Sequence, residues 1–581
     1  MKKILFIITL VLLLCISSCK KNDNNDPDIP DNQEPEVTIV SVTVLNNTLV
    51  TLYSDETEKV SEKIGLNNYQ ELFDYYITYN QDYTKDAESF LDEFSVHNDN
   101  DMRFTYELLN NESYAITSYT GTDLVITTPL YYEGKRVTEI NSLAFKGVNI
   151  EEIVFSEFIT NINTRAFYFC TSVKKVSFLN ANTTLEDESF LFATALEEVN
   201  LPSNIKTLPN RAFKDCKNLK TINNVNGVIQ IGDECFNNCR NIETFDFSDS
   251  IAEIGSKAFS NCSNLIEVIL PKNLELLEEQ TFYNCTSLKT LIFNEELSVI
   301  SANCFSNCNQ LVELNFNDKL TEIAGGAFDH CTSIKEVIFP DSLRMVGSGA
   351  FQECSNIIKV VVNEGLEDLS ASCFLKCVSL SDLQLSSTIN FMSHSCFSGC
   401  VSLTKVTLPN NLRAVYDGVF NGCSNLKEIN IPESVKLFGG SCLSGCTSLK
   451  ELIIHDGVTT ITASSFSGCS SLEVIRIPYF GTSPDNNLPF YTIFGSKVPT
   501  SLHTVIIGEA CDSIPDNAFK NATNVKTIEF GTNIKAIGNN SLTGLSSLQK
   551  ISYRGTLDQF NVINVNDSNA EILSKVQIEY K

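Results

Sequence analysis

Apolar residues recur along most of the chain with a period of 23 residues, after one first step of 22. The clearest marker is one large apolar residue in each period, which we call the anchor. The anchors are Phe145, Phe167, Phe190, Phe213, Phe236, Phe259, Phe282, Phe305, Phe328, Phe351, Phe374, Phe397, Phe420, Leu443 and Phe466, followed after a gap by Phe519 and Leu542. Self-similarity at this period predicts a solenoid, in which each repeat forms one turn of a stack.

One period shows the local structure that the pattern predicts. From Cys262 onward the residues follow Cys-x-x-Leu-x-x-Val-x-Leu-Pro-x-x-Leu-x-x-Leu, and the anchor Phe282 comes five residues later. This alternation predicts a short strand in which Val268 and Leu270 point inward and Ile269 points outward. A single turn cannot cover its own inward side chains, so neighbouring turns must stack. We therefore expect each anchor ring to lie against the anchor rings of the adjacent turns.

The rhythm is interrupted between Pro478 and Ser501. From Phe466 to Phe519 there are 53 residues, which is 30 more than one period, and the extra residues include several Phe and Tyr among Pro, Gly and Asn. Two interpretations stay open. The insertion is either a structural excursion that packs on itself or a binding loop carried by a rigid scaffold.

The full repeat closely resembles the BspA-like class of leucine-rich repeats, from about Phe104 to the C-terminus. Residues 106–145 look like the opening turn of that family and Ile551–Thr556 like its closing turn, although Phe560 stands where the family usually has Trp. The resemblance implies a right-handed leucine-rich repeat solenoid, with a parallel β-sheet on one face and short turns or 3-10 segments on the other. It also implies a cell-surface protein, since some members bind host matrix proteins or other microbes.

The N-terminus has the pattern of an export signal. Lys2 and Lys3 precede the apolar run Ile4–Leu14, which is too short to span a bilayer as a stable helix. The following Ile16-Ser17-Ser18-Cys19 resembles the lipobox of bacterial lipoproteins. We expect a lipoprotein signal peptide at 1–18, lipid on Cys19, and an exported protein anchored at the cell surface, in the outer membrane. An ordinary secretory signal is the alternative.

Two further segments separate this signal from the repeats. Residues 19–36 hold the lipidated Cys and a stretch rich in Asp, Glu and Pro, which cannot bury enough apolar area to fold, so we expect a disordered acidic tether. Residues 37–101 are expected to form a small α/β or α+β module of unknown family. Its predicted elements are a strand at Val37–Val44 and helices at Glu71–Tyr79 and Asp86–Phe94.

The remaining boundaries follow from the repeat itself. The predicted solenoid spans 102–555 and includes the insertion at about 478–501. A C-terminal cap is expected at 556–581, because the last turn of a solenoid has no following turn to cover it.

Composition and charge narrow the possible functions. The chain has 42 Lys and Arg against 71 Asp and Glu, a net charge of −29, and no basic stretch, which disfavours nucleic acids and anionic membrane surfaces as partners. It lacks the G-x-S-x-G, H-E-x-x-H and Walker A motifs, and His394 beside Cys396 and Cys400 is its nearest approach to a reactive cluster. We therefore expect no enzyme activity, no cofactor and no metal, with membrane contact only through the N-terminal lipid.

The cysteines follow the register of the repeat. Of 21 cysteines, thirteen lie three residues after an anchor and five lie directly before one. Free Cys behaves as a small buried apolar residue with a weak donor, so we expect a reduced ladder inside the core. Disulfides between turns and a metal site are the alternatives that the sequence leaves open.

The outward position of each strand predicts a binding face. Polar residues occupy it at both ends of the solenoid, whereas Ile269, Ile292, Ile338 and Val361 form an apolar stripe interrupted by Asn315. Acidic residues flank the stripe two positions earlier, at Glu267, Glu313 and Glu336. On a concave sheet this arrangement suits a protein partner with apolar anchors and a basic rim.

Three alternatives to this adhesin-like or receptor-like role follow from the same residues. The isoleucines can simply reflect strand preference or be covered by a neighbouring segment. The chain would then be a passive structural spacer. A carbohydrate-binding surface component is the third alternative, and it should expose aromatic side chains on the sheet.

Overall fold

The structure, a computed structural model, describes residues 39–45, 48–53, 58–60 and 101–581 except 487 and 496. The chain divides into two compact units, Met1–His97 and Asn98–Lys581. In the first unit, β1 (Ile39–Leu45), β2 (Thr48–Tyr53) and β3 (Glu58–Val60) form an antiparallel sheet in that order. The strand expected at 37–44 corresponds to β1, and the two predicted helices lie outside the described residues.

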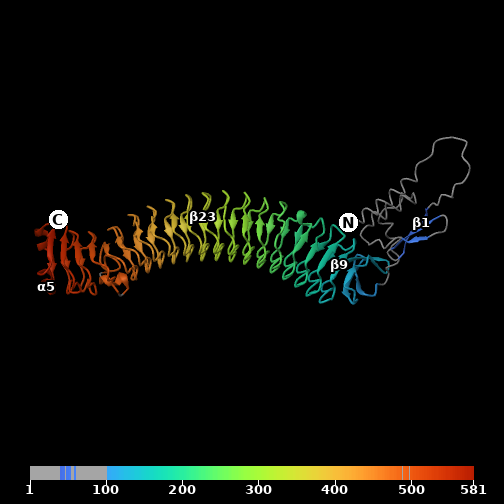
Figure 1. The fold of residues 1–581 in the computed structure, drawn as a ribbon, viewed down its shortest axis with the longest axis horizontal. Coiled ribbons are helices and arrows are strands. Elements are labelled where there is room, and N and C mark those ends of the chain that lie inside the picture. Colours follow the sequence, from blue (N-terminus) through green and yellow to red (C-terminus); the bar gives the residue numbers. More distant parts are fainter. Residues whose placement is uncertain (1–38, 46–47, 54–57, 61–100, 487, 496) are drawn as a thin grey trace, which may run out of the picture. The chain divides into compact units, whose positions relative to one another are not determined.

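The second unit is a solenoid whose turns are stacked in one row from its N-terminal end to the C-terminus (Figure 1). Its opening turn departs from the parallel arrangement: β4 (Phe104–Leu108) and β5 (Tyr114–Tyr119) pair antiparallel, as do β7 (Tyr131–Tyr132) and β8 (Lys135–Ile140). β5 then pairs parallel with β8 and starts the stack. The antiparallel hairpins close the end of the solenoid.

Each regular turn contributes up to two short strands, which form two rows of parallel strands. The first row contains the strands predicted from the repeat: β6 (Val125–Thr127), β9 (Glu152–Phe155), β11 (Lys175–Phe178), β13 (Glu198–Asn200), β15 (Thr221–Asn223), β18 (Glu267–Ile269), β20 (Thr290–Ile292), β23 (Glu336–Ile338), β25 (Lys359–Val361), β27 (Asp382–Gln384), β29 (Lys405–Val406), β31 (Glu428–Ile429), β33 (Glu451–Ile453) and β35 (Val474–Ile477). Most members that pair do so with a 23-residue offset, for example Val268 opposite Leu291. The row is interrupted between β15 and β18, β20 and β23, β27 and β29, and β31 and β33. The predicted parallel solenoid is confirmed.

The second row consists of two-residue strands that precede the anchor, and the repeat pattern alone did not predict it. Its members are β10 (Asn161–Ile162), β12 (Thr184–Leu185), β14 (Thr207–Leu208), β16 (Gln230–Ile231), β17 (Glu253–Ile254), β19 (Leu276–Leu277), β21 (Val299–Ile300), β22 (Glu322–Ile323), β24 (Met345–Val346), β26 (Asp368–Leu369), β28 (Phe391–Met392), β30 (Ala414–Val415), β32 (Leu437–Phe438) and β34 (Thr460–Ile461). Tight backbone turns around the anchor link each second-row strand to the next first-row strand. One 3-10 segment, η2 (Val225–Gly227), lies between a first-row strand and the second-row strand that follows it. The chain thus bends twice in each period.

The anchor rings form a continuous stack through the core, as the sequence predicts. Each ring from Phe145 to Phe420 lies nearly parallel to the next, with centroids 4.6–5.8 Å apart. All of these rings are buried. The stack ends where Leu443 replaces Phe, and the next anchor, Phe466, meets Phe438 and Phe494 edge-on.

The backbone bends around each anchor from Phe145 to Phe519 through two left-handed residues, two positions before and two positions after it. Around Phe259, for example, Lys257 has φ 58° and Asn261 has φ 62°. This conformation costs most residues about 1–2 kcal/mol, whereas Asn and Gly adopt it readily. The position after the anchor accordingly holds Asn or Gly in many turns, at Asn238, Asn261, Asn284, Asn307, Gly399, Gly422, Gly445 and Gly468.

The insertion packs into the solenoid. Phe480, Phe490 and Phe494 are buried, and the segment forms the 3-10 helix η3 (Phe490–Phe494). The amides of Ser464 and Phe466 donate to the carbonyls of Thr492 and Ile493 at 2.9 and 3.0 Å, so η3 occupies the place of a regular turn. Meanwhile β35 pairs directly with the next first-row strand. This packing favours the structural excursion over a free binding loop.

The C-terminal residues extend both rows to the end of the chain. After β36 (Thr504–Ile507), β37 (Ser513–Ile514), β38 (Thr527–Phe530), β39 (Ala536–Ile537) and β40 (Lys550–Tyr553), the helix α4 (Leu557–Asn561) begins at a capping box formed by Thr556 and Gln559. The remaining elements are β41 (Asn564–Val565), η4 (Asp567–Asn569), α5 (Ala570–Leu573) and β42 (Gln577–Tyr580). β41 pairs with β39 and β42 with β40. The segment expected to be a cap therefore adds one more turn, in which α4 links the two strand rows and η4 and α5 replace the anchor bend.

Removing one anchor ring should open a cavity that neither neighbour can fill. The ring centroid of Phe305 lies 5.4 Å from those of both Phe282 and Phe328. We therefore expect Phe305→Ala to lower the free energy of unfolding by about 3–5 kcal/mol. Phe305→Leu is the matched control, because the chain itself carries Leu at two anchors, Leu443 and Leu542, and it should lower the free energy of unfolding less. Urea unfolding followed by circular dichroism measures both, and equal stability of Phe305→Ala and the wild type would contradict the role of the stack.

Candidate protein-binding surface

The predicted apolar stripe lies on the outer surface of the first strand row. Ile269, Ile292 and Ile338 are 50%, 48% and 46% exposed, while the residues directly before them, such as Val268, are buried. Ile269 pairs with Ile292, and Ile338 pairs with Val361, which is half-buried. These side chains therefore face solvent together, in two pairs.

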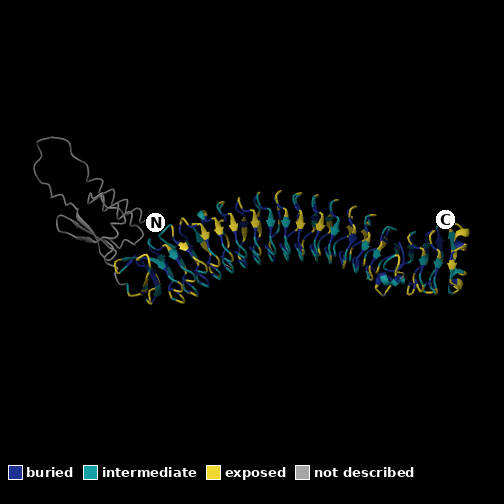
Figure 2. Ribbon diagram, turned by 180° about the vertical axis from the view of Figure 1, so that it is seen from behind, coloured by how far each residue is buried: buried dark blue, intermediate teal, exposed yellow. Residues whose placement is uncertain are grey.

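The two pairs are separated by the turn that carries Asn315. Asn315 is exposed, as expected, but residues 311–316 form no strand, so the ladder pauses between β20 and β23. The stripe is thus two apolar patches joined by one polar turn. Figure 2 shows how exposed positions recur from turn to turn along the solenoid.

The acidic residues predicted beside the stripe also face solvent. Glu267, Glu313 and Glu336 are exposed, on the same side of the strands as the isoleucines. Among the described residues none of the three is in an ion pair. The series of acidic residues ends at Glu336, which pairs across the sheet with Lys359. The rim therefore offers uncompensated negative charge next to apolar side chains.

Two further exposed isoleucines, which the sequence analysis missed, lie close to the stripe along the chain. Ile266 and Ile358 lie directly before β18 and β25 and are 40% and 50% exposed. Both isoleucines stand at the same position of the repeat, one residue before the strand. The turns between them carry Lys289, Val312 and Lys335 at that position. Exposed aliphatic side chains therefore also occur directly before the strands that carry the stripe.

Polar residues bound the stripe on its N-terminal side and bond to one another. The Asn200 amide donates to Ser177 Oγ at 2.9 Å, and the Asn223 amide donates to Asn200 Oδ1 at 2.7 Å. These outward side chains already have partners in neighbouring turns. Burial by a partner would therefore contribute the most binding free energy at the turns that carry the apolar side chains.

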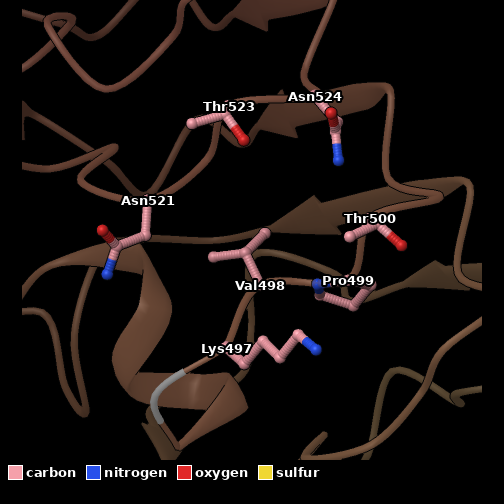
Figure 3. Close-up of a pocket in the computed structure, with 7 residues that line it drawn as sticks. All are labelled: Lys497, Val498, Pro499, Thr500, Asn521, Thr523 and Asn524. Carbon is pink, nitrogen blue, oxygen red and sulfur yellow. The ribbon is translucent and has the colours of Figure 1, made fainter.

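A small cleft lies where the insertion returns to the solenoid (Figure 3). Its volume is about 260 Å³, and it is lined by Lys497, Val498, Pro499, Thr500, Asn521, Thr523 and Asn524. Val498 and Pro499 are buried and lie at its centre, whereas the polar side chains surround them. This cleft is polar and well separated in sequence from the stripe.

The cysteines lie in the core, where the repeat register puts them. In twelve successive turns, from Cys216 to Cys469, the thiol donates to the backbone carbonyl of the preceding anchor at 3.0–3.3 Å. Burial raises the pKa of the Cys308 and Cys423 thiols to about 12. Thiolate, the reactive form, is therefore scarce at neutral pH.

The nearest approach to a reactive cluster is not assembled. His394 is exposed, and its Nδ1 lies 3.7 Å from Oδ2 of Asp417. Cys396 and Cys400 are buried in the core. Within the described part of the chain, no group of three or more His, Cys, Asp or Glu side chains is arranged to hold a metal ion. The same residues include no helix long and apolar enough to cross a membrane.

Comparison with known families agrees with this geometry. A model of the BspA type leucine rich repeat region matches residues 132–220, 183–311, 276–404, 367–488 and 496–571. The chain belongs to the BspA-type leucine-rich repeat family. BspA-type repeats are scaffolds rather than catalytic folds, and proteins that carry them are typical of bacterial cell surfaces.

Several solved structures are similar to the chain. A leucine-rich repeat protein from Bacteroides ovatus is 22% identical over 82% of this chain and 98% of its own, with a TM-score of 0.49. Also similar is a leucine rich cell surface protein from Faecalibacterium prausnitzii, which is 18% identical over 81% of this chain and 97% of its own, with a TM-score of 0.25. The pneumococcal vaccine antigen PcpA is 17% identical over 83% of this chain and 98% of its own, with a TM-score of 0.31. No curated protein matches the chain. The family assignment rests on the repeats and not on these structures.

The buried thiols of this BspA-type solenoid should be reduced and unreactive in the folded protein. We expect iodoacetamide at pH 8.5 to leave Cys216–Cys469 unmodified until denaturant is added, because burial raises their pKa and excludes the reagent. Intact mass under non-reducing conditions should equal that of the reduced chain. An exposed thiol introduced by Asn315→Cys is the positive control, and disulfides between turns would contradict the expectation.

Proposed function

We propose that this BspA-type protein binds a protein partner at the cell surface through the apolar stripe. The contact residues are Ile269, Ile292, Asn315, Ile338 and Val361, with Glu267, Glu313 and Glu336 as the rim. The observation that supports the proposal best is the exposure of Ile269, Ile292 and Ile338, each about half exposed on one face. Clustered exposed aliphatic side chains are typical of interaction sites.

The surroundings of the stripe favour a protein partner of defined chemistry. Apolar side chains at the centre of a patch supply binding energy through burial, and a polar rim excludes water. The rim carboxylates lack cationic partners among the described residues, so a basic rim on the partner would complement them. An adhesin or receptor that contacts a host matrix protein or another cell fits this description.

The alternatives from the sequence have less support. A passive spacer needs no exposed apolar stripe, and a carbohydrate site on the sheet should expose aromatic rings there, whereas the outward positions of the stripe are aliphatic. The net charge of −29 disfavours nucleic acid. We also propose that the solenoid works without enzyme activity, cofactor or metal.

The lipoprotein signal supports the location of this activity. A short apolar run followed by Ile16-Ser17-Ser18-Cys19 places a lipidation sequence directly before the acidic segment 19–36. We propose that lipid on Cys19 anchors the protein at the cell surface in the outer membrane, so that the solenoid meets its partner outside the cell.

Charge placed in the stripe should abolish binding without unfolding the solenoid. We expect the double variant Ile292→Asp and Ile338→Asp to lose binding to an immobilised panel of extracellular-matrix proteins by more than tenfold, measured by surface plasmon resonance. The thermal unfolding temperature should change little, because both side chains are about half exposed.

The matched control uses the same strand position outside the stripe. Ile453 is 43% exposed, and Ile453→Asp should keep wild-type binding. The proposal is wrong if the double variant binds as the wild type does, if Ile453→Asp loses as much, or if no panel protein binds.

Metabolic labelling with a fatty acid tests the anchor. Wild-type protein should incorporate label and Cys19→Ala should not, because the lipid is attached to this thiol. Cys15→Ala, which removes the neighbouring cysteine of the apolar run, should be labelled normally. Equal labelling of the Cys19→Ala variant would rule out lipidation at this site.

A further inference from the structure

Three aromatic side chains, one exposed and two partly buried, form a cluster on the anchor bends near the N-terminal end of the solenoid. Phe169 and Phe192 occupy the same position in adjacent turns and stack with centroids 4.7 Å apart at 27°. Tyr168 meets Phe169 edge-on at 4.7 Å. Phe169 is 45% exposed. This cluster lies outside the strand face that carries the stripe.

The backbone at both phenylalanines is in a conformation that their side chain disfavours. Phe169 has φ 58° and Phe192 has φ 62°, at the left-handed position two residues after the anchor. The next turns fill this position with residues that tolerate it, namely Asp215, Asn238, Asn261, Asn284 and Asn307. Later turns also hold His330, Glu353 and Lys376 in this conformation, so the bend belongs to the repeat, and the pair of Phe side chains in adjacent turns is what distinguishes this part of it.

One face of the ring pair is left uncovered. The equivalent position of the preceding turn is Gly147, which has no side chain, and a Cβ placed there would meet no atom within 4 Å. Lys146 beside it extends over Tyr168, with Nζ 5.9 Å from the ring centroid, and forms no ion pair among the described residues. Arg165 lies at the same distance from that ring and pairs with Glu188. An aromatic face thus lies next to hydrogen-bond donors and an acceptor.

The small size of the cluster and the net charge of the chain indicate which class of ligand can bind there. The apolar surface is limited to a few rings, because Asp215 and Asn238 continue the row with polar side chains, and a protein interface needs about 1,000 Å². The chain's net charge of −29 disfavours polyanions. A pyranose ring needs only one aromatic face for stacking and a few polar groups for its hydroxyls. We propose that Tyr168, Phe169 and Phe192 form a stacking site for neutral polysaccharides, with Lys146 as a hydroxyl donor.

Native affinity electrophoresis of the full chain tests this site. Gels containing xylan, hydroxyethyl cellulose, galactomannan or yeast mannan should retard the wild type in at least one polymer. The double variant Phe169→Asn and Phe192→Asn should weaken that retardation at least tenfold in apparent affinity. Its thermal unfolding temperature should be unchanged or higher, because Asn occupies this left-handed position in later turns. Lys146→Ala should weaken binding less.

Matched controls separate this site from the stripe. Asp215→Asn, at the same position one turn later, and the Ile292→Asp and Ile338→Asp double variant should both be retarded like the wild type. The proposal is overturned if no polymer retards the wild type, if the double Asn variant is retarded equally, or if the stripe variant loses polysaccharide binding. A double Asn variant that unfolds would show that the rings are structural, and that also overturns it.

Discussion

The stacking of one large side chain on its counterpart in the next turn is the interaction on which this solenoid depends. Each turn has too few residues to enclose a core, so its inward side chains are buried only by the turns on either side. The anchor rings meet at 4.6–5.8 Å over a dozen turns, and this contact fixes the 23-residue offset of both strand rows. The stack still accepts a change of one residue in a period, because Phe145 and Phe167 are 22 residues apart and their rings remain stacked at 4.6 Å.

Tight bends around the anchors leave polar backbone groups that need partners inside the core. Left-handed residues on either side of the anchor turn the chain sharply, and the buried thiols donate to the anchor carbonyls of the preceding turn. Cys suits this position because it is small and apolar and still donates a weak hydrogen bond. The two ends of the solenoid differ from the regular turns: β4 and β5 pair antiparallel at one end, and η4 and α5 replace the anchor bend at the other.

Because the core positions are fixed by stacking, chemical variation is confined to outward positions. The same strand slot holds hydrogen-bonded Asn200 and Asn223 in early turns and exposed Ile269 and Ile292 later. The same bend position holds strained Phe169 in one turn and Asn261 in another. A repeat scaffold of this kind can therefore carry separate contact sites on its sheet and on its bends without altering the core.

The sequence by itself determined the period, the anchors, the first strand row, the inward cysteines and the outward isoleucines, because each depends on contacts between equivalent positions of neighbouring turns. It did not determine the second strand row, whose two-residue strands are too short for an alternating pattern. Nor did it show that η3 of the insertion replaces a turn, or that the Asn315 turn interrupts the ladder. The aromatic cluster of Phe169 and Phe192 was missed for a related reason. A Phe in a periodic pattern is assigned to the core by default, and only the left-handed bend leaves Phe169 exposed and Phe192 partly buried.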